Sequence, residues 1–126
     1  MNISHIALWV KDLEKIKNFY CEYFKVRVSA LYHNKDTEFK SYFLTFESGA
    51  KLELMFNPNI CIKQDKNCLG YGHIAIGLGS KEQVDIFTEK LKNDGFAVIS
   101  MPRFTGDGFY ESVILDPEGN KIELTV

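Results

Sequence analysis

The chain has 126 residues, of which 45% are hydrophobic and 13% aromatic, and its formal net charge is −2. This length is typical of one domain, and the composition is that of a globular protein with a sizeable core. No block of lysine or arginine indicates a nucleic-acid partner, and no apolar run approaches the roughly 18 residues of a membrane-spanning helix. We therefore expect neither nucleic acid nor a membrane as a partner.

The first half of the chain predicts one helix and four strands. A strand over 3–10 is rich in β-branched and large apolar residues, and a helix over 13–24 follows, with Asp12 as its N-cap. Three further strands are expected at 26–33, 39–47 and 51–57.

The second half repeats this order after a polar connector over 58–70. A strand over 71–78 precedes a helix over 81–93, and Ser80 with Gln83 forms a capping-box signature at the start of that helix. Strands are expected near 96–101, 109–115 and 120–126, with a loop over 102–108. The apolar stripe of the second helix is expected to be Val84, Phe87 and Leu91.

The two halves share a sequence repeat. His5-Ile-Ala-Leu recurs as His73-Ile-Ala-Ile, and Lys-Leu-Glu53-Leu recurs as Lys-Ile-Glu123-Leu. The histidine-to-glutamate spacing is 48 residues in the first copy and 50 in the second. We therefore predict an α+β fold in which two βαβββ modules, 1–57 and 71–126, form a curved eight-stranded mixed sheet in one domain, with the helices outside and a cleft within.

Strand alternation predicts the face on which each polar residue lies. Leu52 and Leu54 belong to the core, so Glu53 between them lies on the opposite face, away from the helix. The same rule places Glu123 and both histidines on that face. Duplication explains matching apolar residues, since both modules need a core, but it does not explain why the same two polar residues are kept.

Taken alone, each of these polar residues would be interpreted as solvated. Together, His5, Glu53, His73 and Glu123 offer two imidazoles and two carboxylates, a mixed set that suits Ni²⁺, Co²⁺, Zn²⁺, Fe²⁺ or Mn²⁺. The sequence therefore predicts a site for one divalent metal ion. Four protein ligands in an octahedral sphere would leave two positions for water or a substrate.

The chain resembles the vicinal oxygen chelate superfamily, which includes glyoxalases, bleomycin-resistance proteins and dioxygenases. The resemblance covers essentially the whole chain. It rests on His5-Ile-Ala-Leu, Asp12-Leu13, Phe19-Tyr20, Leu52-Glu53-Leu54, Gly72-His73-Ile-Ala and Asp116-Pro-Glu-Gly-Asn-Lys-Ile-Glu123-Leu124. Within the superfamily the full His, Glu, His, Glu set is most similar to glyoxalase I, the lactoylglutathione lyase.

This resemblance implies a metal-dependent lyase or isomerase that acts on a small oxygenated or thiol-conjugated substrate. In glyoxalase I the metal holds two neighbouring substrate oxygens and stabilises an enediolate, while a ligand glutamate moves a proton between adjacent carbons. Glu123 or Glu53 would then be the catalytic base.

Three further positions bear on the substrate. Trp9 stands where glyoxalase I of bacterial type commonly has an arginine that holds a glutathione carboxylate, and an indole cannot form that bidentate pair. Trp9 suggests a flatter, more apolar substrate surface, or packing between the modules. Asn57 matches a polar glutathione contact, and Arg103 is a candidate for another basic contact. Use of glutathione is therefore left open.

Several other functions compete with this interpretation. A ring-cleaving dioxygenase uses two histidines and one carboxylate, and a fourth protein ligand would reduce the positions open to dioxygen and a catecholate. An epimerase of coenzyme A esters usually has glutamine at the position of Glu53. A fosfomycin-type resistance enzyme normally uses two histidines and one glutamate. A drug-binding protein of the bleomycin-resistance kind would need no metal and would use aromatic residues such as Trp9.

The remaining expectations concern location and assembly. Cys21, Cys61 and Cys68 make an odd number with no Cys-x-x-Cys spacing, which favours free thiols in a reducing cytoplasm. The first residues do not resemble a signal peptide. We expect a homodimer, since long sheet edges would be covered by a second copy, with the modules paired either within one chain or between two.

Overall fold

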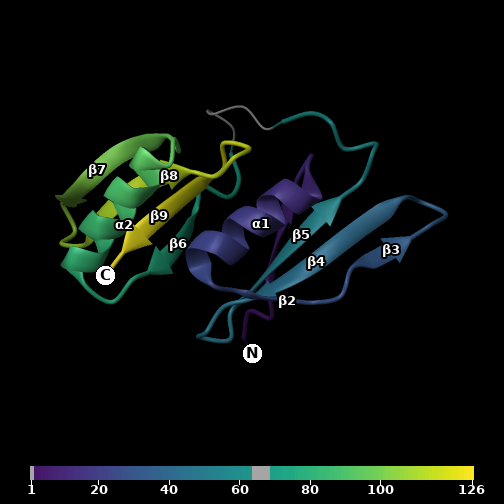
Figure 1. Ribbon diagram of the computed structural model, residues 1–126, viewed down its shortest axis with the longest axis horizontal. Helices are drawn as coiled ribbons and strands as arrows, with labels where there is room; N and C mark the ends of the chain where they lie inside the picture. Colours follow the sequence, from purple (N-terminus) through teal and green to yellow (C-terminus); the bar gives the residue numbers. More distant parts are fainter. Residues whose placement is uncertain (1, 64–68) are drawn as a thin grey trace. The chain divides into compact units, whose positions relative to one another are not determined.

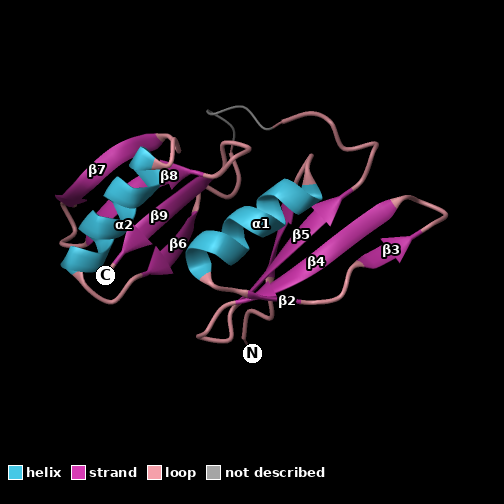
Figure 2. Cartoon of the chain, in the orientation of Figure 1, coloured by secondary structure: helices cyan, strands magenta, loops and turns pink. Residues whose placement is uncertain are grey.

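The computed structural model describes residues 2–63 and 69–126, and the chain divides into two compact units, Met1–Asn67 and Cys68–Val126 (Figure 1). Each unit consists of one helix and one mixed β-sheet (Figure 2). The predicted α+β class with two modules of the same construction is confirmed. Part of the predicted connector and Cys68 lie outside the described residues.

The first unit has one helix and five strands. They are β1 (Ile6–Trp9), α1 (Leu13–Phe24), β2 (Arg27–Val28), β3 (Tyr32–Asn34), β4 (Phe39–Thr45) and β5 (Lys51–Phe56). The sheet order is β1-β5-β4-β2, and β3 also pairs with β4. The β1–β5 pair is parallel, and the other pairs are antiparallel.

The second unit has the same topology. Its elements are β6 (Ile74–Gly77), α2 (Lys81–Asn93), β7 (Val98–Phe104), β8 (Tyr110–Leu115) and β9 (Lys121–Thr125). The sheet order is β6-β9-β8-β7, with β6 and β9 parallel.

Both helices have the bounds that the sequence predicts because their end signals are local. The Asp12 carboxylate accepts a hydrogen bond from the Lys15 amide, and the Ser80 hydroxyl accepts one from the Gln83 amide, so each N-terminus is capped. At the end of α2, Gly95 has φ of 92°, and the amides of Gly95 and Phe96 donate to carbonyls of the last turn. This is a Schellman motif, for which glycine is suited.

The first strand of each module is shorter than the sequence predicts. Instead of 3–10 and 71–78, the strands are β1 and β6, because their parallel partners β5 and β9 begin only at Lys51 and Lys121. Residues before Ile6 and Ile74 therefore have no strand to pair with. His5 and His73 stand just ahead of the ladders rather than within them.

The predicted strand 26–33 is divided into β2 and β3. Val28 pairs with Leu44 and Tyr32 with Ser41, so four steps along one strand match three along β4. The extra residue interrupts the ladder as a β-bulge does. At this break the Ser29 hydroxyl accepts a hydrogen bond from the Phe43 amide.

The predicted loop 102–108 is wrong in its first half. Strand β7 continues through Phe104, and only 105–108 form the turn, in which the Thr105 amide donates to the Phe109 carbonyl. Arg103 consequently lies on a strand.

The buried face of α2 also differs from the predicted apolar stripe. Thr88 is fully buried with Val84 and Leu91, whereas Phe87 is only half-buried.

Hydrogen bonding groups the nine strands of the described residues into two sheets, one in each unit, where we expected a single sheet of eight. The helices cover one face of each sheet. Leu52 and Leu54 are buried with the apolar residues of α1, and Ile122 and Leu124 are buried in the module of α2. The opposite faces carry the candidate ligands. That the two faces line one common cleft remains a prediction.

Candidate metal-binding residues

Each module brings one histidine next to one glutamate. In the parallel ladders Ala7 pairs with Glu53 and Ala75 with Glu123, and each alanine lies two residues after a histidine. Because strand side chains alternate, the histidine and the glutamate share a face. The Nε2 atom of His5 is 3.6 Å from Oε2 of Glu53. The corresponding atoms of His73 and Glu123 are 3.3 Å apart.

These pairs are half-buried in a way that suits ligand binding. The glutamate side chains are 15% and 16% exposed, and the histidine side chains are 39% and 47% exposed. The carboxylates are thus held by their neighbours while the imidazoles are accessible. His5 is further oriented by an edge-to-face contact with Phe43, whose ring centre is 5.2 Å away.

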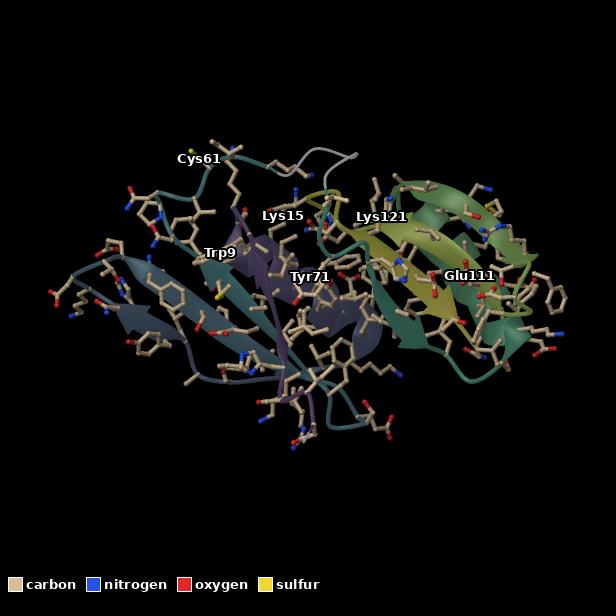
Figure 3. The ribbon with its side chains drawn as sticks, turned by 180° about the vertical axis from the view of Figure 1, so that it is seen from behind. Trp9, Lys15, Cys61, Tyr71, Glu111 and Lys121 are labelled. Carbon is tan, nitrogen blue, oxygen red and sulfur yellow. The ribbon has the colours of Figure 1, made fainter. Side chains whose placement is uncertain are left out.

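In the second module a second carboxylate, that of Glu111, adjoins the pair. Glu111 on β8 pairs with Thr125, two residues beyond Glu123, and therefore lies on the same face (Figure 3 labels Glu111). Its Oε1 atom is 3.4 Å from Nη1 of Arg103. Burial raises the pKa of the Glu123 carboxyl, and Glu111 raises it further, while the charges of His73 and Arg103 lower it.

Sequence reasoning gave Glu111 no role. The first module has Ser41 at the corresponding position, opposite Met55, so comparison of the repeats does not mark this site. The available signal was the alternation of β8, in which Ser112 and Ile114 are buried and Glu111 therefore lies on the other face. The two modules are thus alike in their histidine and glutamate but not in the charge around them.

The structure places the three predicted substrate contacts in different surroundings. Trp9 pairs with Met55 on the face of Glu53, next to Phe39 (Figure 3). Arg103 lies beside Glu111, on the face of Glu123. Asn57 follows β5, and its side chain accepts a hydrogen bond from the Asn59 amide, which gives it a role in that turn.

The third histidine lies apart from these pairs. His33 is at the β3–β4 hairpin, 3.2 Å from a carboxylate oxygen of Glu38. It is not next to either histidine–glutamate pair in the strand register.

The donor atoms fit a divalent metal of mixed nitrogen and oxygen preference. Each module offers one histidine–glutamate pair, and a single pair is too few for a stable site. Within 2–63 and 69–126 no group of three or more histidine, cysteine, aspartate or glutamate side chains is gathered closely enough to hold an ion. The site with four ligands, two from each module, stays a prediction.

Comparison with known proteins identifies the class. The sequence pattern of the Glyoxalase/Bleomycin resistance protein/Dioxygenase superfamily matches residues 2–124, and the chain belongs to this superfamily. This is the group with which the repeated histidine and glutamate motifs agree.

The chain is also similar to individual known proteins. The chain is 28% identical to the lactoylglutathione lyase of Haemophilus influenzae, over 98% of this chain and 90% of that protein. A glyoxylase/bleomycin resistance protein/dioxygenase domain from Frankia shares the fold with a TM-score of 0.84 at 18% identity, covering 100% of this chain and 97% of that one. Glyoxalase I of Zea mays gives a TM-score of 0.80 at 25% identity, covering 98% of this chain and 43% of the maize chain.

Among the described residues, neither helix combines the length and apolar character needed to cross a membrane.

Proposed function

We propose that this protein is a metal-dependent lyase or isomerase of the glyoxalase I type, acting on a small oxygenated or thiol-conjugated substrate. The observation that carries the proposal is the matched pairing of His5 with Glu53 and His73 with Glu123, at equivalent register positions on the face away from each helix. The similarity to a lactoylglutathione lyase supports it.

His5, Glu53, His73 and Glu123 would together hold one Ni²⁺, Zn²⁺, Co²⁺, Fe²⁺ or Mn²⁺ ion. When bound, such an ion supplies positive charge beside two neighbouring substrate oxygens and so makes the adjacent C–H bond more acidic. The imidazole side chains, 39% and 47% exposed, would each bind the ion through a ring nitrogen.

The chain's own residues would move the proton. A general base must attract a proton strongly enough to remove it, and burial beside Glu111 raises the pKa of Glu123 in that direction. Glu123 is therefore the proposed base, with Glu53 as its counterpart for the reverse transfer. Trp9, Asn57 and Arg103 are proposed to contact the substrate.

Metal stoichiometry tests the site. Calorimetric titration with Ni²⁺ should give one ion per chain, and His5→Ala or His73→Ala should each weaken binding by at least about tenfold. His33→Ala is the matched control and should bind as the wild type does. Unchanged affinity in both ligand variants would refute the site. With metal bound, conversion of methylglyoxal and a thiol to a thioester tests the reaction.

A second candidate, binding of small molecules without metal, is favoured by one observation. Trp9 is 43% exposed and Tyr32 is 56% exposed on the face of Glu53, an arrangement that suits apolar ligands. Protein that binds no Ni²⁺ or Zn²⁺ but retains aromatic compounds would favour this alternative over the lyase.

We also propose a homodimer in a reducing compartment such as the cytoplasm. Among the described strands, β1 and β6 each stand at one edge of their sheet, and such edges favour association. Cys21 and Cys61 are free thiols. Light scattering at micromolar concentration tests the dimer, and a monomer would contradict it.

A further inference from the structure

Three aromatic side chains form a cluster at one end of the first sheet. The ring centres of Trp9 and Phe39 are 6.0 Å apart, with their planes at 84°. Those of Tyr32 and Phe39 are also 6.0 Å apart. Trp9 and Tyr32 are well exposed, although large aromatic side chains usually bury most of their surface. We refer to Trp9, Phe39 and Tyr32 as the aromatic cluster.

The cluster lies on the face of the candidate ligands. Trp9 pairs with Met55, two residues beyond the Ala7–Glu53 pair, and Tyr32 pairs with Ser41, which in turn pairs with Met55. Two residues along a strand correspond to about 6.5 Å. If a substrate has two oxygens beside the Glu53 carboxylate and a ring attached to them, the ring is long enough to reach the aromatic cluster.

The parallel ladder of the module forms with or without aromatic residues at its end. In the second module the positions of Trp9 and Met55 are taken by Gly77 and Thr125, and the same parallel ladder forms. The helix-side core of the first module is complete without the cluster, since Leu52 and Leu54 are packed on the opposite face. Trp9 and Tyr32 therefore have no aromatic counterpart in the second module, where Gly77 and Arg103 take the corresponding positions. Phe39 does have one, because Phe109 stands at its position in the repeat.

We propose that the aromatic cluster binds a planar apolar group, such as an aryl ring, of a substrate whose neighbouring oxygens are held by the histidine–glutamate pairs. This inference rests on the proposed function for the position of those oxygens. The ring planes of Trp9 and Phe39 are nearly perpendicular, and Trp9 is still 43% exposed, so its indole is accessible to a stacking partner. All three side chains are uncharged, so the cluster offers no cation to a carboxylate at this position.

A pair of chelating ligands tests the inference. Acetohydroxamate and benzohydroxamate present the same two oxygens and differ by a methyl or a phenyl group. Calorimetry on Ni²⁺-loaded protein should show benzohydroxamate binding about tenfold more tightly, as a buried stacked ring provides. Trp9→Ala should reduce the ratio below about threefold while leaving the affinity for Ni²⁺ unchanged.

Phe104→Ala is the matched control. Phe104 is also an exposed aromatic residue in contact with another ring, that of Tyr110, but the Tyr110 hydroxyl bonds to Asp85 of α2, which places this pair on the helix side. The control should keep the tenfold ratio. Equal affinities of the two hydroxamates in the wild type would overturn the inference while leaving the metal site intact.

A second measurement does not depend on metal. Trp9 is the only tryptophan of the chain, so its fluorescence reports on the cluster alone. p-Nitrobenzyl alcohol, a flat compound that does not chelate, should quench this fluorescence with saturation, and Tyr32→Ala should weaken its binding at least about threefold. Quenching that rises linearly without saturation would overturn the inference. Saturable quenching without any hydroxamate binding would support the cluster and refute the metal-dependent function instead.

Discussion

Glu111 gives the second candidate pair an electrostatic environment that the first lacks. A carboxylate next to Glu123 opposes its ionisation, whereas Arg103, which faces Glu111, favours it. Ser41 at the corresponding position of the first module carries no charge. This difference is the physical reason for assigning the base to Glu123.

Removing the negative charge of Glu111 and removing the positive charge of Arg103 should therefore have opposite effects on the pKa of Glu123. In metal-free protein, Glu111→Gln should lower the pKa of Glu123 because a repelling negative charge is lost. Arg103→Met should raise it because an attracting positive charge is lost. Carboxyl ¹³C NMR titration of Glu123 measures both. Shifts of the same sign in the two variants would contradict this account of the pair.

A hydrogen bond between two side chains links α1 to its sheet. The Tyr42 hydroxyl donates to the Glu14 carboxylate at 2.7 Å, and Lys17 also bonds to Glu14. Lys17 first, and then Tyr42, hold the pKa of Glu14 below its ordinary value of 4.5. A lowered carboxyl pKa contributes stability above the unfolded pKa, and this stability is lost as the pH falls through the folded pKa.

Tyr42→Phe should therefore lower the free energy of unfolding at pH 7 by about 0.5–1 kcal/mol, a modest loss because Glu14 is exposed. The difference from the wild type should shrink as the pH falls through the lowered pKa of Glu14. Urea denaturation at pH 7 and at acid pH measures it, with Tyr32→Phe as the control. A loss that is equal at both pH values would show that the ionised carboxylate is not involved.

At the scale of elements, α2 is joined to β8 by a buried pair of hydroxyls. The Thr88 hydroxyl lies 2.6 Å from that of Ser112 and also donates to the Val84 carbonyl. Both side chains are fully buried, and a buried hydroxyl without its partner costs more free energy than the bond contributes.

Thr88→Val should lower the free energy of unfolding by about 1–3 kcal/mol because it leaves the Ser112 hydroxyl without this partner. Adding Ser112→Ala should recover part of the loss, so the double variant should be more stable than Thr88→Val alone. Urea denaturation of the four proteins gives the coupling. Strictly additive losses would mean that the two hydroxyls do not depend on each other.

The elements that sequence reasoning predicted best are those whose ends are set locally. Asp12, Ser80 and Gly95 act within a few residues of themselves, so both helices were predicted with their observed bounds. The strand ends depend on partners far along the chain. The first strand begins at Ile6 because β5 begins at Lys51, and no pattern within 3–10 contains that information.

At the scale of the molecule, the repeat made the candidate ligands visible in the sequence. A residue that is kept in both copies at polar positions can be recognised without a structure, as His5 and His73 were. Glu111, Trp9 and Tyr32 could not be found in this way, because each lacks a counterpart of the same kind in the other module. The proposed metal site thus rests on the likeness between the modules, and the proposals for its base and its substrate rest on the differences between them.

The proposed ligation of one ion by both modules would have a consequence for their stability. A ligand that binds only the folded state at a concentration 100 times its Kd adds about 2.7 kcal/mol of stability. If one ion is held by ligands of both modules, that gain applies to both at once. Added Ni²⁺ should therefore slow amide hydrogen exchange in β5 of the first module and in β9 of the second.

Replacing a ligand in one module should then reduce the protection in the other. In His73→Ala, the same Ni²⁺ concentration should slow exchange in β5 clearly less than in the wild type, although β5 belongs to the first module and its own residues His5 and Glu53 are unchanged. Exchange measured peptide by peptide with mass spectrometry separates the two strands, and His33→Ala should retain protection in both. Undiminished protection of β5 in His73→Ala would mean that each module binds its own ion. That result would also contradict the proposed proton transfer, because the transfer requires both carboxylates at one ion.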